Sequence, residues 1–156
     1  MRQFKKNVSN GSSPTQQVQK NNLNELEDFL LSLQTNNYSP ETVYNYERDL
    51  KVFNDFLTEM NLPFSKVDKK VIDRFKAYLT SIDRRTANNQ NTGERLRSYS
   101  VNRMLSSLRA YLRYLIEMDL PAPLPPEAVK LTKTERTHPQ VAELFELEKL
   151  IESTST

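Results

Sequence analysis

The sequence predicts an all-α protein built as a small four-helix bundle, and two observations carry this prediction. Leu, Phe and Tyr recur at spacings of three and four along four segments of the chain, which is the period of helices that bury one side. The 156 residues include only two glycines, Gly11 and Gly93, which argues against a turn-rich sheet and against a glycine-rich phosphate loop. With 37% hydrophobic residues, the chain can form one core of moderate size.

The first helix is expected after a disordered arm. Residues 1–21 are rich in Asn, Gln, Ser and Lys and show no apolar period, which is typical of disorder. Asn22 followed by Glu25 has the spacing of a capping box, and the helix is expected to end near Thr35. Its apolar stripe consists of Leu23, Leu26, Leu30 and Leu33.

The second and third helices have clearer start signals. Ser39-Pro40-Glu41 combines an N-cap hydroxyl, a proline at the first helical position and an acid near the positive end of the dipole. Asp68 is the expected cap of the third helix. The apolar stripes are Val43, Tyr46, Leu50, Phe53, Leu57 and Met60, and then Val71, Ile72, Phe75, Leu79 and Ile82. The other side of the second helix carries Thr42, Asn45, Arg48 and Asp49.

A loop over residues 83–97, with arginines at both ends and no apolar period, precedes a fourth helix from Ser98 to Met118. The fourth helix shows two stripes of different character. One is apolar and consists of Val101, Met104, Leu105, Leu108, Leu112, Leu115 and Ile116. The other carries Asn102, Arg103, Ser106, Ser107, Arg109, Ala110 and Arg113, with no acid before Glu117.

The second of these stripes is suited to a polyanion. Guanidinium groups bond phosphate in a bidentate manner, and short Ser and Asn side chains allow a close approach. A charged stripe opposite an apolar one is also typical of a solvated helix surface, which is the alternative interpretation. The single sign of the charge favours nucleic acid. Since the formal net charge is only +2, attraction to DNA depends on this clustering rather than on the total.

Four prolines between residues 121 and 126 predict a stiff extended connector. A new apolar helical pattern then begins at Val141. It is interpreted as the start of a truncated further domain, which divides the chain into residues 1–21, 22–120 and 121–156. The alternative is a helical protein-interaction adaptor that docks a partner through Leu144, Phe145 and Leu147.

Composition also excludes several classes of function. The chain has no cysteine, so disulfides and thiolate metal sites are excluded. We expect no cofactor, no metal site and no catalytic residues, because neither paired carboxylates nor nucleophile-base pairs recur at a recognisable spacing. No apolar run approaches about 18 residues, and we expect a cytoplasmic protein that associates with the nucleoid.

Two stretches carry a resemblance to a known family. Tyr-Ser-Pro-Glu-Thr-Val-Tyr-Asn-Tyr-Glu-Arg-Asp-Leu-Lys-Val-Phe at residues 38–53 and Ser-Val-Asn-Arg-Met-Leu-Ser-Ser-Leu-Arg-Ala-Tyr-Leu-Arg-Tyr-Leu at residues 100–115 resemble the N-terminal core-binding (SAM-like) domain of tyrosine recombinases, the Xer-like phage integrase family. The resemblance implies a four-helix bundle that clamps one face of a recombination site for integration, excision or dimer resolution. It also implies double-stranded DNA and other recombinase subunits as partners.

By this resemblance the second and fourth helices face the DNA. The implied DNA-binding residues are Ser39, Thr42, Tyr46, Arg48, Ser100, Asn102, Arg103, Ser107, Arg109 and Arg113. For Tyr46 a place in the core is the alternative, because it lies on the apolar stripe. Alanine at Arg103, Arg109 and Arg113 is expected to weaken DNA binding and leave the fold intact. The resemblance places the catalytic tyrosine in a following domain, so no strand cleavage is expected from this chain alone.

Overall fold

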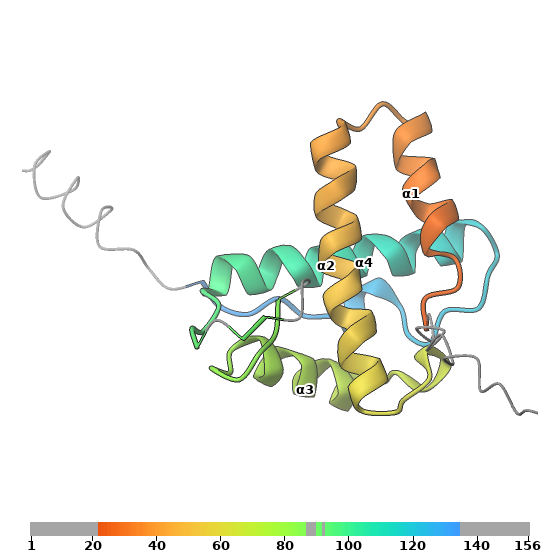
Figure 1. Cartoon of the computed structure of the whole chain (residues 1–156). Coiled ribbons are helices and arrows are strands. Elements are labelled where there is room, and N and C mark those ends of the chain that lie inside the picture. The colour runs from red at the N-terminus through yellow and green to blue at the C-terminus, as the bar shows by residue number, and fades with distance from the viewer. Residues whose placement is uncertain (1–21, 87–89, 92, 135–156) are drawn as a thin grey trace, which may run out of the picture.

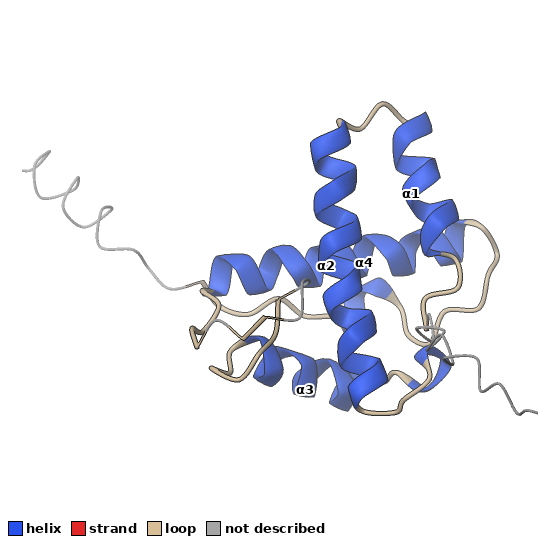
Figure 2. Ribbon diagram, viewed as in Figure 1, coloured by secondary structure: helices blue, strands red, loops and turns tan. Residues whose placement is uncertain are grey.

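The computed structural model describes residues 22–86, 90–91 and 93–134. In these ranges the chain forms four α-helices and two short 3-10 helices, and the only β pairing is an isolated bridge between Arg85 and Asn91. The elements are α1 Leu26–Thr35, α2 Pro40–Glu59, η1 Phe64–Lys66, α3 Lys69–Leu79, α4 Ser98–Glu117 and η2 Pro126–Ala128. The predicted all-α fold is confirmed (Figures 1 and 2).

The helices are arranged around the crossing of α2 and α4. Helices α1 and α2 form a hairpin, and α2 crosses α4 near the middle of both helices (Figure 1). Helix α3 packs against the C-terminal half of α2, where the ring of Phe75 lies 4.9 Å from that of Phe53 and 5.2 Å from that of Phe56. The core therefore lies between the α1–α2 hairpin, α3 and α4.

The predicted starts of α2 and α3 are confirmed. The Ser39 hydroxyl accepts a hydrogen bond of 3.2 Å from the backbone N–H of Thr42. The Asp68 carboxylate accepts one of 2.9 Å from the backbone N–H of Val71. A cap of this kind stabilises a helix by about 1 kcal/mol, because it satisfies one of the free amides of the first turn.

The capping box predicted for the first helix is wrong. Helix α1 begins at Leu26, with Glu25 in the N-cap position and no side-chain cap. The backbone N–H of Asn22 donates instead to Oδ1 of Asn54, over 2.8 Å. Asn22 therefore ties the start of the domain to α2, and this long-range contact competes successfully with local capping.

The core contains most of the residues that the apolar stripes predicted. Leu23, Phe53, Leu57, Val101, Leu105 and Leu112 are among the most deeply buried. Two predicted members are exposed: Ile82, at 51%, lies beyond the end of α3, and Ile116, at 47%, lies in the last turn of α4. Phe29 and Tyr111 were not predicted and are buried, because they pack against each other between α1 and α4, with ring centroids 5.5 Å apart.

The segment after α4 is not the extended connector that its prolines predicted. It turns back along α4 and forms η2, which contacts that helix. Leu124 and Val129 are buried in the core cluster. The loop over residues 83–97 has no helix in its described part, as predicted. The arm of residues 1–21, His138 and the apolar pattern from Val141 onward lie outside the described residues.

Candidate nucleic-acid interface

The basic stripe of α4 is the surface that carries Arg103, Ser106, Arg109 and Arg113. Over most of its length it has positive side chains and no negative ones. Tyr99, Arg103, Ser106 and Arg113 are exposed, and Arg109 is partly exposed. The acid of this stripe is Glu117, in the last turn. Four turns of helix therefore display cations and neutral polar groups to solvent.

A buried carboxylate lies beneath this stripe, at the crossing of α2 and α4. The side chain of Asp49 from α2 is only 1% exposed, and its Oδ1 lies 2.9 Å from NH2 of Arg103. Its Oδ2 accepts a hydrogen bond of 2.8 Å from the Ser107 hydroxyl. The prediction that Asp49 belongs to the exposed side of α2 is wrong.

This arrangement changes the interpretation of two predicted DNA contacts. Arg103 is 45% exposed at its side chain, so it bonds Asp49 on one side and meets solvent on the other. Ser107 is buried, and its hydroxyl is engaged by Asp49 and lies 3.2 Å from the carbonyl oxygen of Arg103. The expectation that alanine at Arg103 leaves the fold intact needs revision, because that variant would leave the Asp49 carboxylate buried without its countercharge.

Asn102 also has an internal partner. Its Nδ2 donates to the carbonyl oxygen of Thr132 over 2.9 Å, and its Oδ1 accepts from the backbone N–H of Thr132 over 2.8 Å. The side chain thus holds the segment after η2 against the first half of α4.

The predicted residues of α2 lie in its first half. Ser39 and Thr42 have their hydroxyl oxygens 2.8 Å apart at the helix start, and Arg48 is exposed. Tyr46 is half-buried, with its ring 5.8 Å from that of Phe29 and 6.5 Å from that of Tyr38.

Tyr46 also marks where α2 and the basic stripe meet. Burial raises the pKa of the Tyr46 hydroxyl, with smaller contributions from Tyr38 and Asp49, while the charge of Arg113 acts in the opposite direction. The ring of Tyr46 therefore contributes to packing, and its hydroxyl interacts electrostatically with Arg113 of the basic stripe.

The structure brings some of the predicted residues together and leaves others apart. Asp49 and Tyr46 of α2 approach Arg103 and Arg113 of α4. Within the described ranges Arg103 forms a salt bridge with Asp49, whereas Arg109 and Arg113 form no ion pair. Ser100 is partly exposed in the first turn of α4.

Two residues of this region were not predicted as part of the site. Tyr99 is 75% exposed and lies one turn before Arg103 on the same stripe. Asp49 lies three residues after Tyr46 and four before Phe53, which places it on the apolar stripe of α2 and is the signal that identifies a buried acid.

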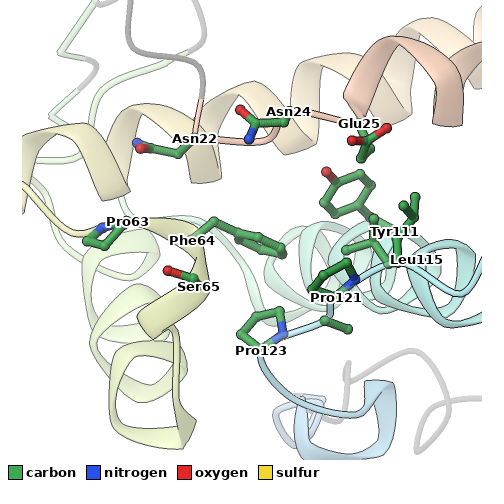
Figure 3. A pocket seen from close by; sticks show the side chains of 12 residues that line it. Asn22, Asn24, Glu25, Pro63, Phe64, Ser65, Tyr111, Leu115, Pro121 and Pro123 are labelled. Atoms are coloured by element: carbon green, nitrogen blue, oxygen red, sulfur yellow. The ribbon is translucent and has the colours of Figure 1, made fainter.

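A pocket of about 660 Å³ lies apart from the basic stripe (Figure 3). Its walls are the segment before α1, η1, the buried side of α4 and the first residues after α4. They include Asn22, Glu25, Phe64, Tyr111, Leu115 and Pro121. Across the described residues, no group of three or more His, Cys, Asp or Glu side chains is placed to hold a metal ion. None of the helices in these ranges has the length and apolarity needed to span a membrane.

Comparison with known proteins gives a consistent result. Residues 26–118 match the family described as phage integrase, N-terminal SAM-like domain. The chain is similar to a tyrosine recombinase XerC of Lacticaseibacillus casei (strain BL23), with 34% identity over 119 residues that cover 73% of this chain and 36% of the relative. It is also similar to a tyrosine recombinase XerC of Halalkalibacterium halodurans, with 36% identity over 90 residues that cover 56% of this chain and 26% of the relative.

The chain spans about a third of the length of the curated relatives it matches, 36% in the longest alignments. No solved structure shows a significant match.

Proposed function

Because the chain belongs to the phage integrase N-terminal SAM-like domain family, we propose that it is the DNA-binding part of a site-specific tyrosine recombinase. In this role it grips one face of double-stranded DNA at the recombination site through α2 and α4. The catalytic step of integration, excision or dimer resolution takes place elsewhere in the recombinase. Other recombinase subunits bound to the same site are the expected protein partners.

The main support for the proposal is that, among the described residues, the charges of Arg109 and Arg113 are not paired with acids. Both belong to the basic stripe of α4, and neither is neutralised by an ion pair in the described part of the chain. Solvated arginines of one sign along a helix favour phosphate, because each neutralised phosphate releases condensed counterions from the duplex. A merely solvated surface helix normally mixes its charges.

The proposed contacts follow from where each side chain lies. Arg103, Arg109 and Arg113 bond phosphates, with Arg48 and the hydroxyls of Ser39, Thr42 and Ser100 at the edges. Ser107 and Asn102 act inside the protein, because their polar groups are engaged by Asp49 and Thr132. Tyr46 supports the interface mainly through packing.

The affinity of the isolated chain is expected to be weak. Binding that depends mainly on phosphate contacts has dissociation constants of about 10⁻⁴ to 10⁻⁶ M at physiological salt. The formal net charge of +2 adds little long-range attraction, so the local stripe dominates.

The test is a salt series of DNA affinity with a double variant, Arg109→Ala/Arg113→Ala. We expect weaker binding and a log-log salt slope that is smaller by about 1.8, which corresponds to two phosphate contacts at about 0.9 each. The matched control is Lys69→Ala/Lys70→Ala, which removes the same charge from exposed positions at the start of α3.

Equal losses in the two double variants would contradict the assignment of the α4 stripe, because only net charge would then matter. Wild-type binding that does not depend on salt would contradict DNA binding through arginines altogether.

A further inference from the structure

We propose that Asp49, although it is an acid beneath a DNA-binding surface, strengthens DNA binding because it positions the guanidinium of Arg103. This inference rests on the proposed function. It assigns to Asp49 a positioning role, since its carboxylate is buried and acts on the DNA through another side chain.

The contacts of Asp49 join three side chains across two helices. Oδ1 lies 2.9 Å from NH2 of Arg103, and Oδ2 lies 2.8 Å from the hydroxyl oxygen of Ser107. Arg103 and Ser107 are one helical turn apart on α4, so one carboxylate of α2 holds side chains on two successive turns of α4. Both carboxylate oxygens are satisfied, as a buried charge requires.

The depths of the two charges differ. The side chain of Asp49 is 1% exposed and that of Arg103 is 45% exposed. The pair therefore presents its positive end to solvent, and the negative end lies below the surface. A phosphate that approaches the stripe meets the guanidinium first.

The guanidinium keeps most of its bonding capacity. A guanidinium carries about five N–H donors in a fixed plane, and Asp49 engages only one of its nitrogens, NH2. Once that nitrogen is held, the orientation of the remaining donors is restricted before DNA arrives. Fixing one flexible side chain in advance is worth about two- to tenfold in affinity.

This positioning role and simple charge counting predict opposite effects. If Asp49 only cancels a positive charge, its removal makes the stripe more basic, and both DNA affinity and the salt slope rise. If Asp49 positions Arg103, its removal lets the guanidinium move among rotamers, and both quantities fall.

The decisive variant is Asp49→Asn, which keeps the shape of the side chain and its ability to hydrogen-bond. Measured over a salt series on duplex DNA, we expect affinity to fall about two- to tenfold and the slope to shrink by up to about 0.9. Unchanged or tighter binding, or a steeper slope, would overturn the proposal. Circular dichroism establishes that each variant is folded at the temperature of the assay.

A double-variant cycle separates positioning from a general effect on the fold. In an Arg103→Ala background, Asp49→Asn is expected to cause no further loss of affinity, because there is no guanidinium left to position. Additive losses would overturn the proposal.

Ser107→Ala provides the test if Asp49→Asn does not fold. This variant changes no charge, and Ser107 is buried, so it reaches DNA only through Asp49 and Arg103. A measurable loss of affinity supports the proposal, and unchanged affinity overturns it.

Failure of this inference can be distinguished from failure of the proposed function. Undiminished binding by Arg109→Ala/Arg113→Ala counts against the proposed function itself. Weaker binding by that variant, together with no loss for Asp49→Asn, overturns only the role of Asp49.

Discussion

The side-chain amide of Asn102 hydrogen-bonds both backbone groups of Thr132, with Nδ2 to oxygen at 2.9 Å and nitrogen to Oδ1 at 2.8 Å. The Thr132 hydroxyl also lies 2.9 Å from the same Oδ1. Thirty residues separate the two positions in the chain. The Asn102 amide thus bonds both backbone groups of Thr132, as a neighbouring strand would, and holds the residues after η2 beside the basic stripe.

Replacing Asn102 with Ala is expected to release the residues around Thr132, which follow η2, from the surface of α4. The backbone groups of Thr132 lose their partner, which costs about 1–3 kcal/mol locally, while the core residues are unaffected. Limited trypsin digestion should then cleave faster after Lys130 and Lys133, and the Thr132 amide should exchange faster with deuterium. Ser106→Ala, an exposed change on the same helix, is the control. Equal cleavage rates in the two variants would show that the hydrogen bonds between Asn102 and Thr132 do not restrain this segment.

The returning segment is also expected to stabilise the whole domain. Leu124 is buried in the core cluster, and a Leu→Ala change at such a site costs about 2–5 kcal/mol. Urea unfolding of Leu124→Ala should show this loss, whereas Leu131→Ala, at a position that is 43% exposed, should cost much less.

A chain that ends at residue 120 tests the predicted domain boundary more severely. The shortened chain lacks both Leu124 and Val129, which belong to the core cluster, so it should be less stable than the Leu124→Ala variant. If it unfolds at the same urea concentration as the complete chain, the boundary predicted at residue 120 is sufficient for folding.

Tyr111 makes stability sensitive to alkaline pH. Burial raises the pKa of its hydroxyl from 10.0 to about 12, and its surroundings include the backbone of Glu25, which it meets beside the pocket in Figure 3. The folded state therefore keeps this proton at a pH where the unfolded chain has lost it. Stability from this group is complete below pH 10 and is lost as pH rises toward 12, by at most about 3 kcal/mol.

The measurement is thermal or urea unfolding of the wild type and Tyr111→Phe between pH 8 and about 11.5. The variant should lose less stability over this range, although some loss remains because burial also raises the pKa values of Tyr46 and Tyr114. Tyr99→Phe, at an exposed position, is the matched control. Identical pH profiles for wild type and Tyr111→Phe would contradict the assignment.

This chain is expected to bind DNA without cutting it. Strand cleavage by a tyrosine needs groups that activate the nucleophile and stabilise the phosphorane, and the sequence contains a single histidine, His138. Incubation with duplex DNA followed by denaturing electrophoresis should show no covalent adduct. A protein-linked DNA band that disappears when one tyrosine is changed to phenylalanine would contradict this prediction.

The sequence by itself determined the helical class, the order of the helices and the start sites of α2, α3 and α4. Periodic apolar residues define which side of a helix is buried, and a cap such as Ser39 or Asp68 acts on amides only three residues away. Such signals are local, so they survive without knowledge of the fold. The same reasoning identified the arginine stripe of α4, because a stripe is a property of one helix.

Only the tertiary structure decided what the polar residues at the helix crossing do. On α4 alone, Ser107 and Asn102 have the positions of surface groups, and the apolar stripe of α2 places Asp49 on the buried side without indicating its partner. Their partners lie 54, 58 and 30 residues away in the sequence. Whether a polar side chain is buried depends on which element crosses above it, and a buried polar group requires a partner that only folding supplies. The capping box predicted at Asn22 is wrong for a related reason, since the backbone N–H of Asn22 bonds the side chain of Asn54 on α2 instead.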